Sequence, residues 1–213
     1  PGQGMASAAL FEIIVNGVGC HAAAPHQGID PIVAGSAIVE GLQTISSRTT
    51  NPIEGIVVSV TQFHAGEADN VIPDQAILRG TARSFAVESE KILEPLIRRV
   101  AAGVASAHGA TIELNYDHRY PVLVNEPVSS DVALKVATEV VGEEAIDVAY
   151  PPTMASEDFA FMLNEVPGCF VRLGSKLAGE TSHPLHSAHY KFNDDVLPIG
   201  ASFWAQLAET VLK

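Results

Sequence analysis

The stretch LFEIIVN, residues 10–16, decides how the fold begins, because its apolar side chains recur at every second position. Phe11, Ile13 and Val15 share one face of an extended chain, whereas Glu12 lies on the other face. Alternation with a period of two is typical of a β-strand that buries one side. We therefore predict a strand here, with its apolar face turned toward a core.

The segment that follows, GIDPIVAGSAIVEGLQTISSRT at residues 28–49, changes to a different period. Its small and apolar residues repeat at intervals of three and four, which is the pattern of an amphipathic helix. The helix is predicted to begin at Asp30 and Pro31, because aspartate is a good N-cap and proline suits the first helical position.

The next hundred or so residues complete one folding unit. A strand is predicted over residues 55–66, a second over 75–85, a helix over 92–104 and a further strand over 110–118. Pro95 is expected to kink or shorten this helix, because proline lacks a backbone N–H. The resulting order is that of the ferredoxin-like split βαβ arrangement, a four-stranded sheet with two helices on one face. Its other face is left open to a partner, for example a second copy.

The second half of the chain is richer in helices. Helices are predicted over residues 128–142, 156–166 and 194–213, and short strands over 145–150 and 168–174. Ser130 or Asp131 is the expected N-cap of the first helix, and Ser156 that of the second. Since sheets usually contain about 4–6 strands, this half is predicted to be the tail of a larger α/β domain whose other strands lie upstream.

Composition narrows the classes of partner and the compartment. The 213 residues carry a formal net charge of −13, which argues against nucleic acid or an anionic membrane as a partner. Two cysteines give no disulfide framework, so a reducing cytoplasm is the default location. The sequence has no apolar run approaching the ~18 residues of a membrane span, and it opens with no signal peptide.

Chemistry-bearing residues first gather in GCHAAAPH, residues 19–26. His21 is a candidate for metal binding or acid–base work, or it simply ends a strand. A Cys20–His21 nucleophile pair is disfavoured, because neighbouring residues of a strand point to opposite faces. His26, beside a proline, is expected to be structural.

Three further stretches carry candidate residues: HAGEADNVIPD at 64–74, MASEDF at 154–159 and SHPLHSAHYKFNDD at 182–195. His64 is expected to lie partly buried on the apolar face of its strand. A serine nucleophile in MASEDF lacks the Gly-x-Ser-x-Gly elbow and is rejected. His183, His186 and His189 are spaced by three, so they form a candidate zinc triad, although a loop containing a proline need not bring them together.

Taken together, the four stretches resemble the metal-dependent N-acyl-amino-acid amidohydrolases, the family of aminoacylases, hippurate hydrolases and carboxypeptidases. The resemblance implies an α/β protein with an α+β lid. Residues 1–8 would be a linker from the catalytic domain, residues 9–118 a ferredoxin-like lid and dimerisation domain, and residues 119–213 the C-terminal part of the catalytic domain. The N-terminal part of that domain, which carries most metal ligands and the catalytic glutamate in the family, would be absent.

The same resemblance assigns roles at the reacting carbonyl. His21 and Asn70 would polarise the scissile carbonyl and stabilise the oxyanion, in some members across the dimer in the partner's site. His186 would be the terminal ligand of one of two metal ions. Taken on their residue types alone, Asn70 also suits a turn and His21 a strand end.

Four more residues are assigned to substrate binding by resemblance. Arg83 and Arg119 stand where the family has arginines that meet a substrate carboxylate, a contact that guanidinium groups make bidentately. Surface ion pairs explain both arginines equally well. Ser156 and Glu157 stand where a loop and helix start cradle the substrate, and a plain helix cap with first-turn acids also explains them.

The reaction implied by the resemblance is hydrolysis of the amide bond of N-acyl amino acids by metal-activated water. Two divalent ions are expected in the complete enzyme (zinc, or manganese, cobalt or nickel), with one ligand in this chain. The expected partners are a small N-acyl amino acid, a second copy through the lid, and the missing N-terminal segment. The chain alone is expected to be inactive. The alternatives are a non-catalytic dimerisation or binding module and a one-metal hydrolase built on three histidines.

Overall fold

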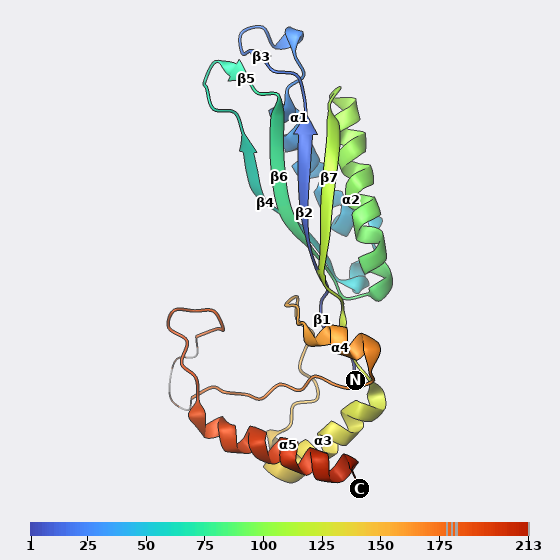
Figure 1. The fold of residues 1–213 in the computed structure, drawn as a ribbon, viewed down its shortest axis with the longest axis vertical. Helices are drawn as coiled ribbons and strands as arrows, with labels where there is room; N and C mark the ends of the chain where they lie inside the picture. The colour runs from blue at the N-terminus through green and yellow to red at the C-terminus, as the bar shows by residue number, and fades with distance from the viewer. Residues whose placement is uncertain (178, 180, 182, 213) are drawn as a thin grey trace. The chain divides into compact units, whose positions relative to one another are not determined.

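A computed structural model describes residues 1–177, 179, 181 and 183–212 (Figure 1). The chain divides into two compact units. The sheet unit comprises Gln3–Leu123 and Pro152–Met162, and the C-terminal unit comprises Pro1–Gly2, Val124–Pro151 and Leu163–Lys213. The protein therefore combines α and β structure, as predicted, with residues 152–162 grouped with the sheet unit although they lie far along the chain.

The sheet unit is built on four antiparallel strands in the order β4-β6-β2-β7. Its elements are β2 (Ala8–Asn16), α1 (Pro31–Thr44), β4 (Ile56–Ala65), β6 (Gln75–Ser84), α2 (Val87–Ala107) and β7 (Thr111–Tyr120). Short strands flank them: β1 (Gly2–Met5), β3 (Cys20–His21), β5 (Val71–Ile72) and β8 (Leu123–Asn125). The four long strands and two helices predicted for this part of the sequence are confirmed.

One face of the sheet is covered by α1 and α2, which lie on the same side in Figure 1. Phe11, Ile13 and Val15 are buried on this face, which confirms the alternation in β2. They pack in one cluster with apolar residues of both helices, such as Leu42 and Ile97, which are fully buried. Burying each such side chain stabilises the fold by about 1.5–3 kcal/mol before the entropy of ordering is counted.

Both helices of the sheet unit begin or continue for identifiable reasons. The Asp30 carboxylate accepts the backbone N–H groups of Ile32 at 2.8 Å and Val33 at 3.3 Å, so the predicted start of α1 is confirmed. Pro95 lies inside α2, which runs on to Ala107. The expected shortening is therefore wrong, because packing of the apolar stripe on the sheet outweighs one missing backbone hydrogen bond.

A β-bulge in β4 changes which residues face the core. The register with β6 shifts between Val60 and Gln62. After the bulge Phe63 pairs with buried Leu78, and its ring occupies the space beside Gly35 of α1. His64 consequently turns to the helix-free face and is exposed, so the expected partial burial of this histidine is wrong.

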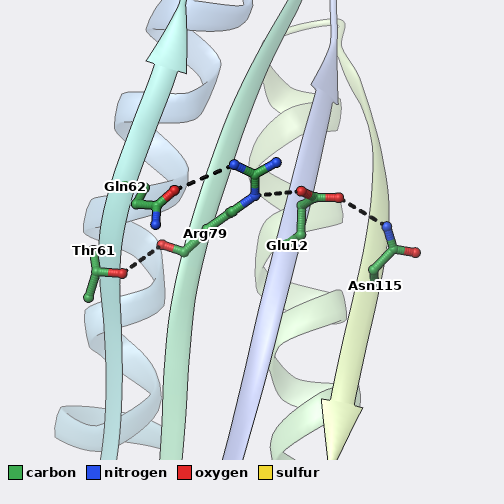
Figure 2. Close-up of polar contacts among 5 residues, drawn as sticks. All are labelled: Glu12, Thr61, Gln62, Arg79 and Asn115. Carbon is green, nitrogen blue, oxygen red and sulfur yellow. Dashed lines mark hydrogen bonds and ion pairs between the residues drawn. The ribbon is translucent and has the colours of Figure 1, made fainter.

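The helix-free face carries a row of polar side chains that crosses the strands (Figure 2). Arg79 Nε lies 2.6 Å from Glu12 Oε2, and Asn115 Nδ2 donates to Glu12 Oε1 at 3.2 Å. Arg79 Nη1 also reaches Gln62 Oε1 at 3.5 Å. The hydrogen bond from Arg79, followed by that from Asn115, holds the pKa of Glu12 below its ordinary value. This face is therefore suited to water.

The helices of the second half are α3 (Pro127–Val141), α4 (Phe159–Glu165) and α5 (Leu197–Val211). The N-cap of α3 is Glu126, whose carboxylate accepts the N–H groups of Ser129 at 2.7 Å and Val128 at 2.9 Å. These hydrogen bonds, first that from Ser129, lower the pKa of Glu126. The prediction of Ser130 or Asp131 as the cap is wrong, because Pro127 already suits the first helical position and glutamate can reach back to the first turn.

Residues 145–150 and 168–174, all of which the structure describes, form no strand, so both strand predictions are wrong. Phe170 contacts the side-chain amide of Asn125, donating its N–H at 2.7 Å and accepting at 3.1 Å. A strand requires a neighbouring strand for its backbone groups, and this apolar segment has none among the described residues.

Among the helices of the described residues, the structure contains none with the length and apolar composition needed to cross a membrane.

Candidate functional site

The two-stranded ladder of β3 and β5, the β3–β5 ladder, brings the backbones of two predicted site residues close together at one end of the sheet unit (Figure 1). Cys20 pairs with Ile72 and His21 pairs with Val71 in antiparallel register. Just beyond this ladder, the Ala22 N–H donates to the backbone carbonyl of Asn70 at 2.9 Å. The backbones of His21 and Asn70 therefore come close together although the two residues are distant in sequence, and both side chains are exposed.

The hydrogen bonding of His21 selects one form of its imidazole. Nδ1 of His21 accepts the backbone N–H of Ala23 at 3.0 Å. A neutral imidazole whose Nδ1 is an acceptor carries its proton on Nε2. The exposed ring thus offers an Nε2–H donor, and Asn70 adds an amide donor that does not titrate. Two such donors suit a carbonyl oxygen on which negative charge develops.

The two predicted arginines lie near the other end of the same sheet. Arg83 follows Ala82 in β6, and Arg119 follows His118 in β7. Both Ala82 and His118 pair with Ala9, which lies at the beginning of β2. The arginines therefore lie at the end of the sheet where β2 starts, whereas the β3–β5 ladder follows the end of β2.

Both arginines already have partners in the structure. Arg83 Nη1 donates to the hydroxyl of Thr81 and, at 3.0 Å, to the carbonyl of Ala82. Arg119 Nε lies 2.8 Å from Asp117 Oδ2. A substrate carboxylate would have to compete with Asp117 for Arg119, whereas the hydrogen-bond partners that the described part of the chain gives to Arg83 are neutral. Arg83 is thus the better anion-binding candidate of the two.

Ser156 and Glu157 precede the helix that they were expected to start. Helix α4 begins at Phe159, so the prediction of Ser156 as its N-cap is wrong. The carbonyl of the neighbouring Ala155 accepts the N–H of Ala6 at 3.0 Å, which places this loop beside the beginning of β2. Ser156 and Glu157 therefore lie at the same end of the sheet unit as the two arginines.

The predicted residues of the sheet unit thus form two groups. Because a strand rises about 3.3 Å per residue, the nine residues of β2 separate the β3–β5 ladder from the end of the sheet that carries the arginines by roughly 25 Å. A small substrate does not span that distance, so His21 and Arg83 of one copy do not serve one substrate.

The three histidines of the C-terminal unit do not form a cluster. The rings of His183 and His189 lie 5.4 Å apart, centre to centre, and His186 between them has a positive φ of 68°. Across the described residues, no three His, Cys, Asp or Glu side chains are grouped closely enough to hold a metal ion. The prediction of a three-histidine site is therefore wrong.

The other groups whose pKa values are shifted lie outside the β3–β5 ladder. Burial raises the pKa of Glu90 on α2 and that of Tyr116 on β7. Their neighbour His118 has Nε2 3.8 Å from Glu94 Oε2. Burial also raises the pKa of the Cys169 thiol, which is the opposite of what a reactive cysteine needs. These shifts follow from packing rather than from a second site.

Comparisons with known proteins extend this picture. Residues 5–210 match the model of the family described as peptidase family M20/M25/M40. The chain is 38% identical over 212 residues to the hippurate hydrolase of Campylobacter jejuni, a match that covers all of this chain and 54% of that protein. It is 35% identical over 209 residues to the N-acetylcysteine deacetylase of Bacillus subtilis, a match that covers 98% of this chain and 53% of that protein.

Solved structures agree with these matches. A dinuclear metal-binding peptidase of the M20 family from Bacillus subtilis superposes with a TM-score of 0.79 at 31% identity, over 99% of this chain and 52% of that one. A Staphylococcus aureus protein superposes with a TM-score of 0.92 at 30% identity, over 100% of this chain and 55% of that one. The chain therefore spans about half the length of the relatives that it matches.

Proposed function

Because this chain belongs to peptidase family M20/M25/M40, we propose that it forms part of a metal-dependent amidohydrolase that cleaves the amide bond of N-acyl amino acids. Two relatives support this substrate class by name: hippurate is the N-benzoyl derivative of glycine, and N-acetylcysteine is the N-acetyl derivative of cysteine. The common element of these substrates is an amide carbonyl close to a free carboxylate.

The observation that carries the proposal is that the β3–β5 ladder brings together two residues with side-chain donors, His21 and Asn70. His21 presents Nε2–H, since Nδ1 is occupied by the Ala23 N–H, and the backbone of Asn70 is bonded to the next residue, Ala22. When a nucleophile attacks an amide carbon, the carbonyl oxygen gains negative charge. Fixed donors aimed at that oxygen stabilise the transition state by about 3–4 kcal/mol each.

The carboxylate of the substrate is the natural partner of an arginine at the opposite end of the sheet unit. Arg83 donates to two neutral oxygens, and Arg119 is the second choice because Asp117 already pairs with it. Ser156 and Glu157 belong to the same end and would border this part of the substrate. A guanidinium binds a carboxylate with two parallel hydrogen bonds, which orients the substrate as well as holding it.

The roughly 25 Å between these two groups, estimated from the rise of β2, favours a site built by two copies. We infer that the sheet unit is a ferredoxin-like lid through which the enzyme dimerises. In that arrangement His21 and Asn70 of one copy act on the substrate that Arg83 of the other copy holds. A non-catalytic dimerisation module is the alternative, and it predicts a dimer without turnover.

The proposed enzyme uses two divalent metal ions, as the relative from Bacillus subtilis described as dinuclear does. The described residues cannot hold such ions by themselves. We propose His186 as one imidazole ligand, with the others supplied by a catalytic segment outside this chain. When bound, the ions would supply an activated water molecule. The residues of this chain would orient the substrate and bind its carbonyl oxygen.

The test has two arms. The purified 213-residue chain is analysed for bound zinc, manganese, cobalt and nickel and assayed with N-benzoylglycine; we expect neither metal nor turnover, and turnover by the chain alone would refute its role as part of a site. In the complete enzyme that contains this chain, His21→Ala and Arg83→Ala are purified singly and then mixed. Shared sites predict that mixed dimers regain activity that neither variant shows alone; no regain after confirmed subunit exchange contradicts them.

A further inference from the structure

The β3–β5 ladder that carries His21 is too short to hold its own position. Only two residue pairs join β3 to β5, and an isolated pair of strands is marginally stable at best in water even when a tight turn links them. Gly17 and Gly19 lead into it, and neither has a side chain that could anchor the segment by packing. Contacts outside the ladder therefore fix the backbone before His21. Val18 exchanges two backbone hydrogen bonds with Ile29, each at 2.9 Å, and the glycines on either side of Val18 have a different partner.

Asp74 makes that connection at two points. Its backbone carbonyl accepts the N–H of Gly17 at 2.8 Å, and its carboxylate Oδ1 accepts the N–H of Gly19 at 2.7 Å. Asp74 directly precedes Gln75, which pairs with Asn16 at the end of β2. The aspartate thus links the backbone that leads into β3 to the end of the β2–β6 ladder in the four-stranded sheet.

The space around Gly19 is small, although Asp74 itself is exposed. A Cβ added at Gly19 would lie 2.9 Å from the carbonyl oxygen of Ile72 and 3.0 Å from Asp74 Oδ1. The chain that follows β3 also packs closely against it, because a Cβ at Gly28 would lie 2.6 Å from Cys20 Sγ. The backbone path into β3 is therefore confined on both sides.

We propose that Asp74 is a positioning residue for His21. By holding the Gly19 N–H, its carboxylate sets the register of β3, and so the backbone turn in which the Ala23 N–H reaches Nδ1 of His21. The Nε2–H is then presented outward in one orientation. This inference rests on the proposed function in that His21 is the carbonyl-binding donor, whereas the geometric claim about Asp74 stands apart from it.

The local sequence around Asp74 gives little sign of this role. Asp74 follows Pro73 and precedes a strand, a context that is typical of ordinary turn chemistry. Only the paired register of β2 and β6 brings it beside Gly17 and Gly19, which are more than fifty positions earlier in the chain.

The test uses the 213-residue chain with Asp74→Ala, Asp74→Asn and, as a matched control, Asp131→Ala, a change at an exposed position of α3. Amide hydrogen exchange of Gly19 and the ¹⁵N shifts of the His21 ring are measured by NMR, and thermal melting checks that each variant is folded. In Asp74→Ala, Gly19 exchange is expected to rise at least about tenfold, because a charge-assisted hydrogen bond is lost. The ring shifts are expected to move toward a mixture of the two tautomers.

The outcomes are distinct. Asp74→Asn keeps an acceptor oxygen and should restore most of the Gly19 protection and the Nε2–H form; Asp131→Ala should match the unmodified chain. Unchanged Gly19 exchange and His21 shifts in a folded Asp74→Ala chain would overturn the inference. In the complete enzyme the same substitution should lower kcat and leave KM for N-benzoylglycine nearly unchanged. Altered NMR signals with an unchanged kcat would instead refute the role of His21 in the proposed function.

Discussion

The backbone N–H of Ala23 donates to Nδ1 of His21 across 3.0 Å, so a turn only two residues long decides which ring nitrogen of that histidine carries the proton. A histidine at a strand end is usually an ordinary surface residue. Here its tautomer and its donor direction are set by the backbone, which is what a carbonyl-binding group requires.

Replacing His21 by alanine in the complete enzyme should lower kcat about 10²–10³-fold with little change in KM, because the lost contact strengthens only as the oxyanion forms. Steady-state kinetics with N-benzoylglycine provide the measurement. His26→Ala is the matched control, since His26 lies in a neighbouring 3₁₀ turn, Pro25–Gln27. Equal losses in both variants would indicate damage to the loop rather than loss of a donor.

The histidines of the C-terminal unit can be separated by metal analysis of the complete enzyme. His186→Ala should lose at least one metal equivalent per chain, whereas His189→Ala should keep its metal content, because His189 packs on the ring of His183. The metal-to-protein ratio after dialysis is the readout. Retention of both ions by His186→Ala would remove that residue from the proposed ligand set.

The pair Glu12–Arg79 on the helix-free face predicts a pH dependence of stability. The pKa of Glu12 is lower in the folded chain than its ordinary value, 4.5, chiefly through the hydrogen bond from Arg79. Its contribution is therefore complete above that ordinary value and is lost as pH falls through the lowered one. At neutral pH the contribution is small, about 0–1 kcal/mol, because the pair is exposed.

Glu12→Gln should consequently melt at nearly the same temperature as the unmodified chain at pH 3, and at a slightly lower temperature at pH 7. Thermal melts across this range test the sign, with Glu67→Gln, in an exposed loop, as the control. A larger loss of stability at pH 3 than at pH 7 would contradict the assignment.

The core of the sheet unit offers a prediction about stability. Leu78 is fully buried in β6, where it pairs with Ile13 and Phe63. Leu78→Ala should lower the free energy of unfolding by about 2–5 kcal/mol, through lost burial and the cavity left behind. Chemical denaturation measures it, and Leu212→Ala, at an exposed position near the end of the chain, should change little.

Local chemistry made much of the sheet unit predictable. The alternation in β2, the spacing in α1 and the cap at Asp30 each depend on residues close together in sequence, so the sequence alone was enough to predict them. The close approach of the His21 and Asn70 backbones could not be derived in this way. It depends on the pairing of β3 with β5, and only family resemblance linked the two residues at the level of sequence.

The predictions that are wrong share one physical origin: they depend on contacts between residues that are distant along the chain. The bulge in β4 that turns His64 outward is a property of the β4–β6 register, since alternation within one strand cannot show an inserted residue. Residues 168–174 have the composition of a strand, but composition cannot supply the neighbouring strand that its backbone needs.

Neighbouring residues alone therefore encode which of the long strands and helices of the sheet unit form, because the period of the apolar residues and the capping residues are read within one segment. Strand pairing in the folded chain is what places Asp74 against Gly19 and sets His21 and Arg83 at opposite ends of the sheet unit. Both relationships depend on how strands pair, and the pairing free energy comes from groups that meet only when the chain has folded.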